Sequence, residues 1–241
     1  FEENLNRYSK FLDKIIHVKV EDMPGNQDAW VNDRFQRDQI FRGIKDASPD
    51  DLIMVSDLDE IIRPEAVDYM RDSPMSLFAI RMTLHNFKFN YMKQIPDRYS
   101  PWAMAGRRQL FNHLMPDAFR QVRFQFFDKS YQFKNDGCEV IEHGGWHFGY
   151  MGDKNWLLDK AQSFAHTEVD TPEFLAQIDP DASIEKRTSW KQDSNDKYEV
   201  VDLDDYFPAY ILNNRDRFKK FILEDSGKKA VDFLPPFPYN R

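Results

Sequence analysis

The sequence of 241 residues contains a single cysteine, Cys138, so it can form neither an internal disulfide nor a thiolate zinc cluster. A lone cysteine also fits a reducing compartment. The sequence has no run approaching the roughly 20 apolar residues that a membrane-spanning helix needs. These absences exclude a disulfide scaffold and predict a chain without a membrane span.

The sequence also lacks an excess of basic residues. It has 33 Lys and Arg against 41 Asp and Glu, a formal net charge of −8. This balance argues against a nucleic-acid partner, because such binding relies on neutralising phosphates. An acidic surface also repels any other phosphate-bearing substrate at long range. A site for such a substrate would therefore need local positive charge from Arg, Lys or a bound metal.

What the sequence has in quantity is apolar and aromatic residues, which make up 41% and 15% of the chain. Together with 31% charged residues, this composition is typical of a globular protein. The aromatic excess indicates a bulky core, with an aromatic-lined sugar cleft as the alternative. No repeat or linker interrupts the chain, so we predict a single domain over residues 1–241.

Hydrophobic spacing predicts several helices and one hairpin. The hairpin or half-buried strand is expected over 76–92, followed by an irregular basic stretch over 94–127. Gly144–Phe148 is expected to be a compact loop. The helices are expected over 4–16, 27–46, 153–167, 171–178, 183–191 and 206–223, the last four forming a helical C-terminal region.

The most informative segment runs from Asp51 to Glu65. Leu52–Val55 is a continuous apolar run, typical of a strand buried on both faces of a mostly parallel sheet. It ends at Asp57-Leu58-Asp59-Glu60, and Pro64 then opens a helix to about Arg71. A strand, an acidic turn and a helix place a site at the carboxyl end of a strand. The fold class is therefore predicted as α/β, a mixed and mostly parallel sheet flanked by helices.

Asp57 and Asp59 stand one residue apart, so their carboxylates repel each other unless a cation or proton lies between them. Such oxygen ligands suit Mn²⁺ or Mg²⁺, which can bridge to substrate phosphates. The alternative is a solvated charge run. Two enzyme classes place this pattern after an apolar strand. One is the haloacid-dehalogenase-like phosphatases, with Asp57 as nucleophile; the other is the nucleotide-sugar glycosyltransferases, with both aspartates as metal ligands.

Three segments together resemble glycosyltransferase family 17, the β-1,4-mannosyl-glycoprotein 4-β-N-acetylglucosaminyltransferases. They are Leu52–Ile61, Gly145-Trp146-His147 and Tyr210–Phe218, which occur in the family's order. The resemblance implies a GT-A-like fold that lacks the family's opening strand. It also implies inverting transfer of GlcNAc from UDP-GlcNAc to a hydroxyl of a glycan acceptor, with Mn²⁺ or Mg²⁺ as cofactor. A non-catalytic carbohydrate-binding protein is the alternative from another class.

Two departures from the family pattern imply a distant, microbial branch. Ile62 and Arg63 intervene before Pro64, and Phe148 follows Gly-Trp-His where animal and plant members tend to have cysteine. A microbial member is expected in the cytoplasm. A Golgi-lumenal form would need an N-terminal anchor that these residues do not contain.

The glycine-rich segment supplies further candidates. His147 is expected to bind the metal or contact the diphosphate, with a packed loop histidine as the alternative. Gly144 and Gly145 would allow close approach of the backbone to the substrate, or merely a tight turn. Trp146 would stack on a sugar ring or belong to the core.

The remaining candidates come from other segments. Arg37 matches a family position and would contact the substrate, although a surface ion pair explains it equally well. An inverting transferase needs a carboxylate that deprotonates the acceptor hydroxyl. The unranked candidates for this base are Glu60, Glu142 and Asp153.

Overall fold

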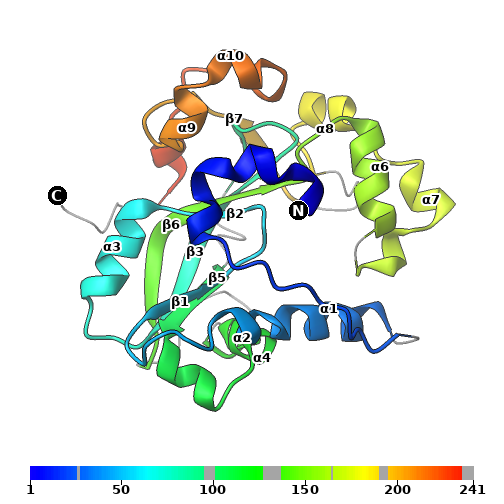
Figure 1. Cartoon of the computed structure of the whole chain (residues 1–241). Coiled ribbons are helices and arrows are strands. Elements are labelled where there is room, and N and C mark those ends of the chain that lie inside the picture. The colour runs from blue at the N-terminus through cyan, green and yellow to red at the C-terminus, as the bar shows by residue number, and fades with distance from the viewer. Residues whose placement is uncertain (26–27, 95–100, 127–136, 164, 190–194, 235–241) are drawn as a thin grey trace.

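The computed structural model of the chain describes residues 1–25, 28–94, 101–126, 137–163, 165–189 and 195–234. A curled, mixed sheet of seven strands lies at the centre and helices flank it (Figure 1). This arrangement confirms the predicted α/β class. None of the helices in these ranges has the length and apolar character that a membrane span requires.

The sheet is mixed, but its strands are mostly antiparallel. Its main path follows the order β1 (Leu52–Val55), β5 (Pro101–Arg107), β3 (Leu77–Asn86), β4 (Tyr91–Lys93) and β7 (Tyr198–Val200). Off this path, β6 (Glu139–Gly149) pairs with β3 and with β2 (Glu60–Ile62). Only β3 and β6 are parallel among the six described pairings.

The prediction of a mostly parallel sheet was therefore wrong. Leu52 and Ile53 of β1 do pack in separate core clusters, as the apolar run suggests. However, β1 pairs antiparallel with β5, and Met54 is 38% exposed. A continuous apolar run indicates that a strand is largely buried. It does not indicate whether the neighbouring strand is parallel or antiparallel.

Helices surround the sheet largely where the sequence places them. The helix expected from Pro64 is confirmed as α3, and the helix expected over 27–46 is divided at Gln39 into α1 and α2. The helical C-terminal region is confirmed as a series of short helices. The described helices are η1 (Glu2–Lys14), α1 (Ala29–Asp38), α2 (Ile40–Gly43), α3 (Pro64–Asp72), η2 (Arg108–Asn112), α4 (Pro116–Gln121), α5 (Arg123–Phe126), α6 (Lys154–Ser163), η3 (Thr167–Val169), α7 (Pro172–Leu175), α8 (Pro180–Lys186), α9 (Ala209–Leu212), α10 (Arg215–Phe218), η4 (Lys219–Phe221) and η5 (Ala230–Phe233).

The stretch over 94–127, expected to be irregular, contains β5 and several short helices. Ala103, Met104 and Ala105 of β5 are completely buried between β1 and β3. Small residues such as alanine are depleted in strands, so this segment carries only a weak strand signal. The prediction of an irregular stretch was wrong for this reason.

The expected loop over Gly144–Phe148 is instead the end of the long strand β6. Here β6 pairs with β2, with Glu60 opposite His147 and Ile62 opposite Gly145. Two consecutive glycines suggest a turn, but here they allow strands to approach closely. A Cβ atom would lie 2.4 Å from Ile80 Cγ2 at Gly144, and 2.1 Å from the Ile61 carbonyl oxygen at Gly145.

Gly145→Ala is expected to destabilise the fold by about 3 kcal/mol or more, because the added methyl group meets the backbone of β2 rather than a side chain that can move. Urea unfolding followed by circular dichroism measures this loss. Gly25→Ala is the control, since nothing lies within 4 Å of its Cβ position, although its positive φ adds a small strain of its own. A loss at Gly145 no greater than at Gly25 would contradict this account of β6.

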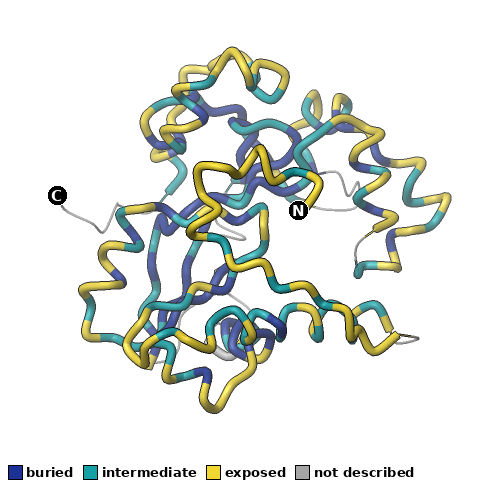
Figure 2. The backbone as a smooth tube through the Cα atoms, in the orientation of Figure 1, coloured by how far each residue is buried: buried dark blue, intermediate teal, exposed yellow. Residues whose placement is uncertain are grey.

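The core brings together the segments on which the family resemblance depends. The central strands are buried, whereas η1 is exposed along its length (Figure 2). Trp146 and Phe148 of β6 form a cluster with Ile211 of α9, and Phe218 of α10 packs against that cluster. The Gly-Trp-His segment and the Tyr210–Phe218 segment are therefore in contact through the core. Strand β2 carries the end of the Leu52–Ile61 segment alongside β6.

Candidate functional site

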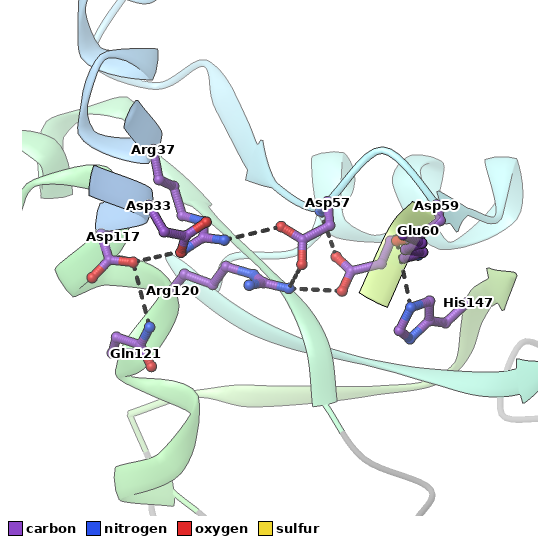
Figure 3. Close-up of polar contacts among 10 residues, drawn as sticks. Asp33, Arg37, Asp57, Asp59, Glu60, Asp117, Arg120, Gln121 and His147 are labelled. Carbon is purple, nitrogen blue, oxygen red and sulfur yellow. Dashed lines mark hydrogen bonds and ion pairs between the residues drawn. The ribbon is translucent and has the colours of Figure 1, made fainter. Parts of the chain in front are cut away.

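The acidic turn Asp57–Glu60 connects β1 to β2 and is closed by its own hydrogen bonds. Glu60 N donates to the Asp57 carbonyl oxygen at 3.1 Å, and Asp57 N donates to Glu60 Oε2 at 2.7 Å. Leu58, between the two aspartates, is fully exposed. The turn therefore holds Asp57 and Asp59 at the surface of the domain, and the two carboxylates meet different partners (Figure 3).

Both carboxylate oxygens of Asp57 accept hydrogen bonds from arginines. Arg37 of α1 donates to Oδ1 at 3.2 Å, and Arg120 of α4 donates to Oδ2 at 2.5 Å (Figure 3). Arg120 also donates to Glu60 at 2.7 Å, and the Glu60 side chain is completely buried. Arg37 further pairs with two more aspartates, Asp33 and Asp117. Asp57 thus belongs to a network that ties α1 and α4 to the turn.

Asp59 faces the opposite side, toward β6 and α6. His147 Nε2 lies 3.4 Å from Oδ1, and Lys160 Nζ donates to Oδ2 at 3.0 Å. The backbone of the same residue accepts a hydrogen bond from Phe148 N at 2.8 Å, which fixes its position beside β6. Burial acts to raise the pKa of Asp59, but His147 and Lys160 outweigh it and hold that pKa well below its usual range.

The spacing of Asp59 and His147 is compatible with two ligands of one divalent cation. Two neighbouring ligands of one ion, each about 2.1 Å from it, lie roughly 3 Å apart, and Asp59 Oδ1 and His147 Nε2 are 3.4 Å apart. Within the described part of the chain, no three His, Cys, Asp or Glu side chains are grouped to hold a metal ion. An ion here would therefore have two protein ligands, with water and substrate phosphate completing its shell, as is common for Mg²⁺.

The charges around the turn bear on which ligand can bind. Four basic side chains and six acidic ones give a formal sum of −2 with His147 counted as neutral. They are Arg37, Arg120, Arg123 and Lys160, with Asp33, Asp38, Asp57, Asp59, Glu60 and Asp117. Arg123 remains a cation at neutral pH, although burial and the neighbouring Arg120 lower its pKa to about 10. A divalent cation would change the sum to 0, which removes the net repulsion of an anionic phosphate.

The three candidates for the catalytic base lie in different environments. Glu60 is buried, and both of its carboxylate oxygens accept hydrogen bonds. Glu142 pairs with Arg81 at 2.8 Å, and it lies five residues before His147 on β6, roughly 15 Å along the strand. Asp153 is exposed and caps α6 by accepting from Trp156 N at 3.1 Å. Only Glu60 lies within the cluster, where it positions Arg120.

The predicted substrate-binding residues also differ in their environments. Arg37 belongs to the Asp57 network, so its ion pairs are part of the site rather than isolated on the surface. Trp146 is 2% exposed, and its ring packs 4.1 Å from the Arg63 guanidinium, so in this structure it cannot stack on a ligand. Gly144 and Gly145 lie against the neighbouring strands. The structure thus brings Asp57, Asp59, His147, Glu60 and Arg37 together.

Sequence reasoning missed Arg120, Arg123 and Lys160. The two arginines lie in the stretch expected to be irregular, and Lys160 lies on a helix with an ordinary mixture of residues. The only available signal for Lys160 was its position between the apolar residues Leu157 and Ala161, which both face the core. Charged residues of this kind are usually solvated, so no pattern in the sequence assigns them to the site.

Comparison with known proteins gives no match: no family model, curated protein or solved structure is significantly similar to this chain. The family resemblance and the activity that it implies therefore remain predictions. The arrangement of the site is the basis for the proposal that follows.

Proposed function

We propose that the chain is a glycosyltransferase that requires a divalent cation and takes its sugar from a nucleotide-sugar donor. One observation carries the proposal. Asp59 of the acidic turn and His147 of the Gly-Trp-His segment lie far apart in the sequence, yet their side chains are 3.4 Å apart. The pairing of β2 with β6 fixes this approach, because Glu60 lies opposite His147. The two motifs therefore form one site.

The residues have distinct roles in this proposal. Asp59 and His147 would hold Mn²⁺ or Mg²⁺, which would offset charge on a leaving diphosphate. Arg37 and Arg120 fix Asp57 and thereby hold the shape of the turn. Glu60 positions Arg120 from its buried place beneath the turn.

The proposed acceptor is a hydroxyl group of a glycan, and an inverting transfer needs a base to deprotonate it. Glu60 is buried, Glu142 pairs with Arg81, and the exposed Asp153 accepts a hydrogen bond from Trp156 N at the start of α6. The base therefore stays unassigned among the three.

The geometry does not favour the phosphatase alternative. In that mechanism, Asp57 would attack a phosphoryl group with one carboxylate oxygen. Both of its oxygens are instead bound by guanidinium groups, at 3.2 and 2.5 Å. Trapping by fluoroberyllate, which mimics an aspartyl-phosphate, would revive this alternative.

UDP-GlcNAc is expected to be the preferred donor, by about 5- to 150-fold over UDP-glucose and GDP-mannose. The expectation rests on the family resemblance, and one hydrogen bond and apolar contact to an acetamido group can contribute roughly 1–3 kcal/mol. Donor consumption with Mn²⁺ and a mixed glycan acceptor pool measures the preference. If GDP-mannose or UDP-glucose is consumed faster, the donor assignment fails while the cation-dependent transferase survives.

A further inference from the structure

We propose that Lys160 is the built-in counter-cation of Asp59 and that it competes with the divalent cation for this carboxylate. The inference rests on the proposed function, because it concerns the cation that the transferase would use. It assigns a role to a residue that the sequence motifs do not include.

The Lys160 ammonium group lies against Asp59 and two aromatic rings. Its Nζ atom lies 3.0 Å from Asp59 Oδ2, while His147 occupies the other carboxylate oxygen. The ammonium also lies 4.8 Å from the ring centroid of Tyr150 and 5.4 Å from that of Trp156. Ring faces attract a cation at such distances. The ammonium is thus held by one carboxylate and two rings beside the proposed ion position.

The helix that carries Lys160 is fixed by the core. Leu157 and Ala161 of α6 are 2% and 1% exposed, and they pack in a core cluster with Phe87 and Tyr91. The backbone of Lys160 therefore keeps its place when its partner changes. Only the flexible side chain has to move, and that side chain is 25% exposed.

The charges of Lys160 and of a divalent ion at Asp59 would oppose each other. A divalent ion bound by Asp59 and His147 would lie within a few ångströms of the ammonium, where like charges repel strongly. Binding of the ion therefore requires Lys160 to give up Asp59. Oxygens of a nucleoside diphosphate bound to the ion can then accept hydrogen bonds from the displaced ammonium. Lys160 weakens binding of the ion alone and favours binding of the ion together with the diphosphate.

Titration of the whole chain with Mn²⁺, followed by the electron paramagnetic resonance signal of the free ion, tests this competition. Lys160→Met is expected to bind Mn²⁺ alone at least about 10-fold more tightly than the unmodified chain. Lys160→Arg keeps the charge and is expected to stay within about twofold. With saturating UDP, the gain in Mn²⁺ affinity is expected to be smaller in Lys160→Met than in the unmodified chain.

The matched control is Lys154→Met, which removes the same charge from an exposed position on the same helix. Equal tightening in Lys154→Met and Lys160→Met would overturn the specific role of Lys160, since it would reflect net charge alone. Unchanged or weaker Mn²⁺ binding in Lys160→Met would also overturn it, while leaving the proposed transferase intact. If no variant binds Mn²⁺, with or without UDP, both proposals fail.

Discussion

Asp59→Asn is expected to lower the rate of donor turnover by about 10³-fold or more and to abolish detectable Mn²⁺ binding. The amide keeps the shape of the side chain but removes the charge that would hold the proposed ion between Asp59 and His147. A metal ion contributes several kcal/mol to stabilising the charge of a leaving group, and each 1.36 kcal/mol corresponds to a tenfold change in rate. Initial rates of nucleotide release, with Mn²⁺ titrated separately, measure the two effects.

The control for this variant is Asp51→Asn, which replaces an exposed aspartate just before β1. Its carboxylate accepts a hydrogen bond from Ser48 N at 2.8 Å. This variant is expected to keep its rate within about twofold. Turnover by Asp59→Asn at the unmodified rate would remove Asp59 from the mechanism.

Arg120→Met is expected to destabilise the protein by about 3–5 kcal/mol. The side chain of Arg120 is 5% exposed, and that of its partner Glu60 is completely buried. Removing the guanidinium leaves the Glu60 charge buried without its counter-ion, which is the costly outcome for a buried pair. The change in the free energy of unfolding is measured by urea titration.

Two further variants test whether the loss of stability comes from the buried Glu60 charge or from the loss of any ion pair. Arg71→Met breaks an exposed pair with Asp68, in which both side chains are more than 60% exposed, and is expected to cost about 0–1 kcal/mol. Combining Arg120→Met with Glu60→Gln removes the stranded charge, so the double variant should be less destabilised than the sum of the two single variants. Full additivity would show that the pair does not act as a unit.

Local signals in the sequence were enough to predict the segment around the acidic turn. The apolar run at Leu52–Val55 forms β1, and Pro64 opens α3. Both features depend on neighbouring residues: a run of apolar side chains that favours a strand, and a proline that suits the first turn of a helix. The helices around the sheet follow for the same reason, since their apolar spacing is local.

Strand direction and the structure of the glycine-rich segment could not be predicted in this way. The parallel pairing of β6 with β3 and its antiparallel pairing with β2 are contacts between distant segments. Glycine is required at Gly144 and Gly145 because Ile80 and Ile61 lie so close, and neither neighbour is near in the sequence. From the sequence alone, two glycines in succession look like a turn.

The site was predicted in part. The acidic pair and His147 were selected as residues whose chemistry suits a cation, and the structure brings Asp59 and His147 together. That Asp57 instead meets two guanidinium groups depends on where α1 and α4 lie. Arg120 and Lys160 are of residue types that usually lie at the surface, so only the fold reveals that they pair with carboxylates of the acidic turn.

The most direct test of the central claim is the initial rate of UDP release from UDP-GlcNAc in the presence of a glycan acceptor pool, measured with Mn²⁺ and with excess EDTA. The proposed function predicts release with Mn²⁺, loss of release in EDTA and recovery when Mn²⁺ is restored. The same rate in EDTA as in Mn²⁺ would contradict a site in which Asp59 and His147 hold a divalent cation for glycosyl transfer.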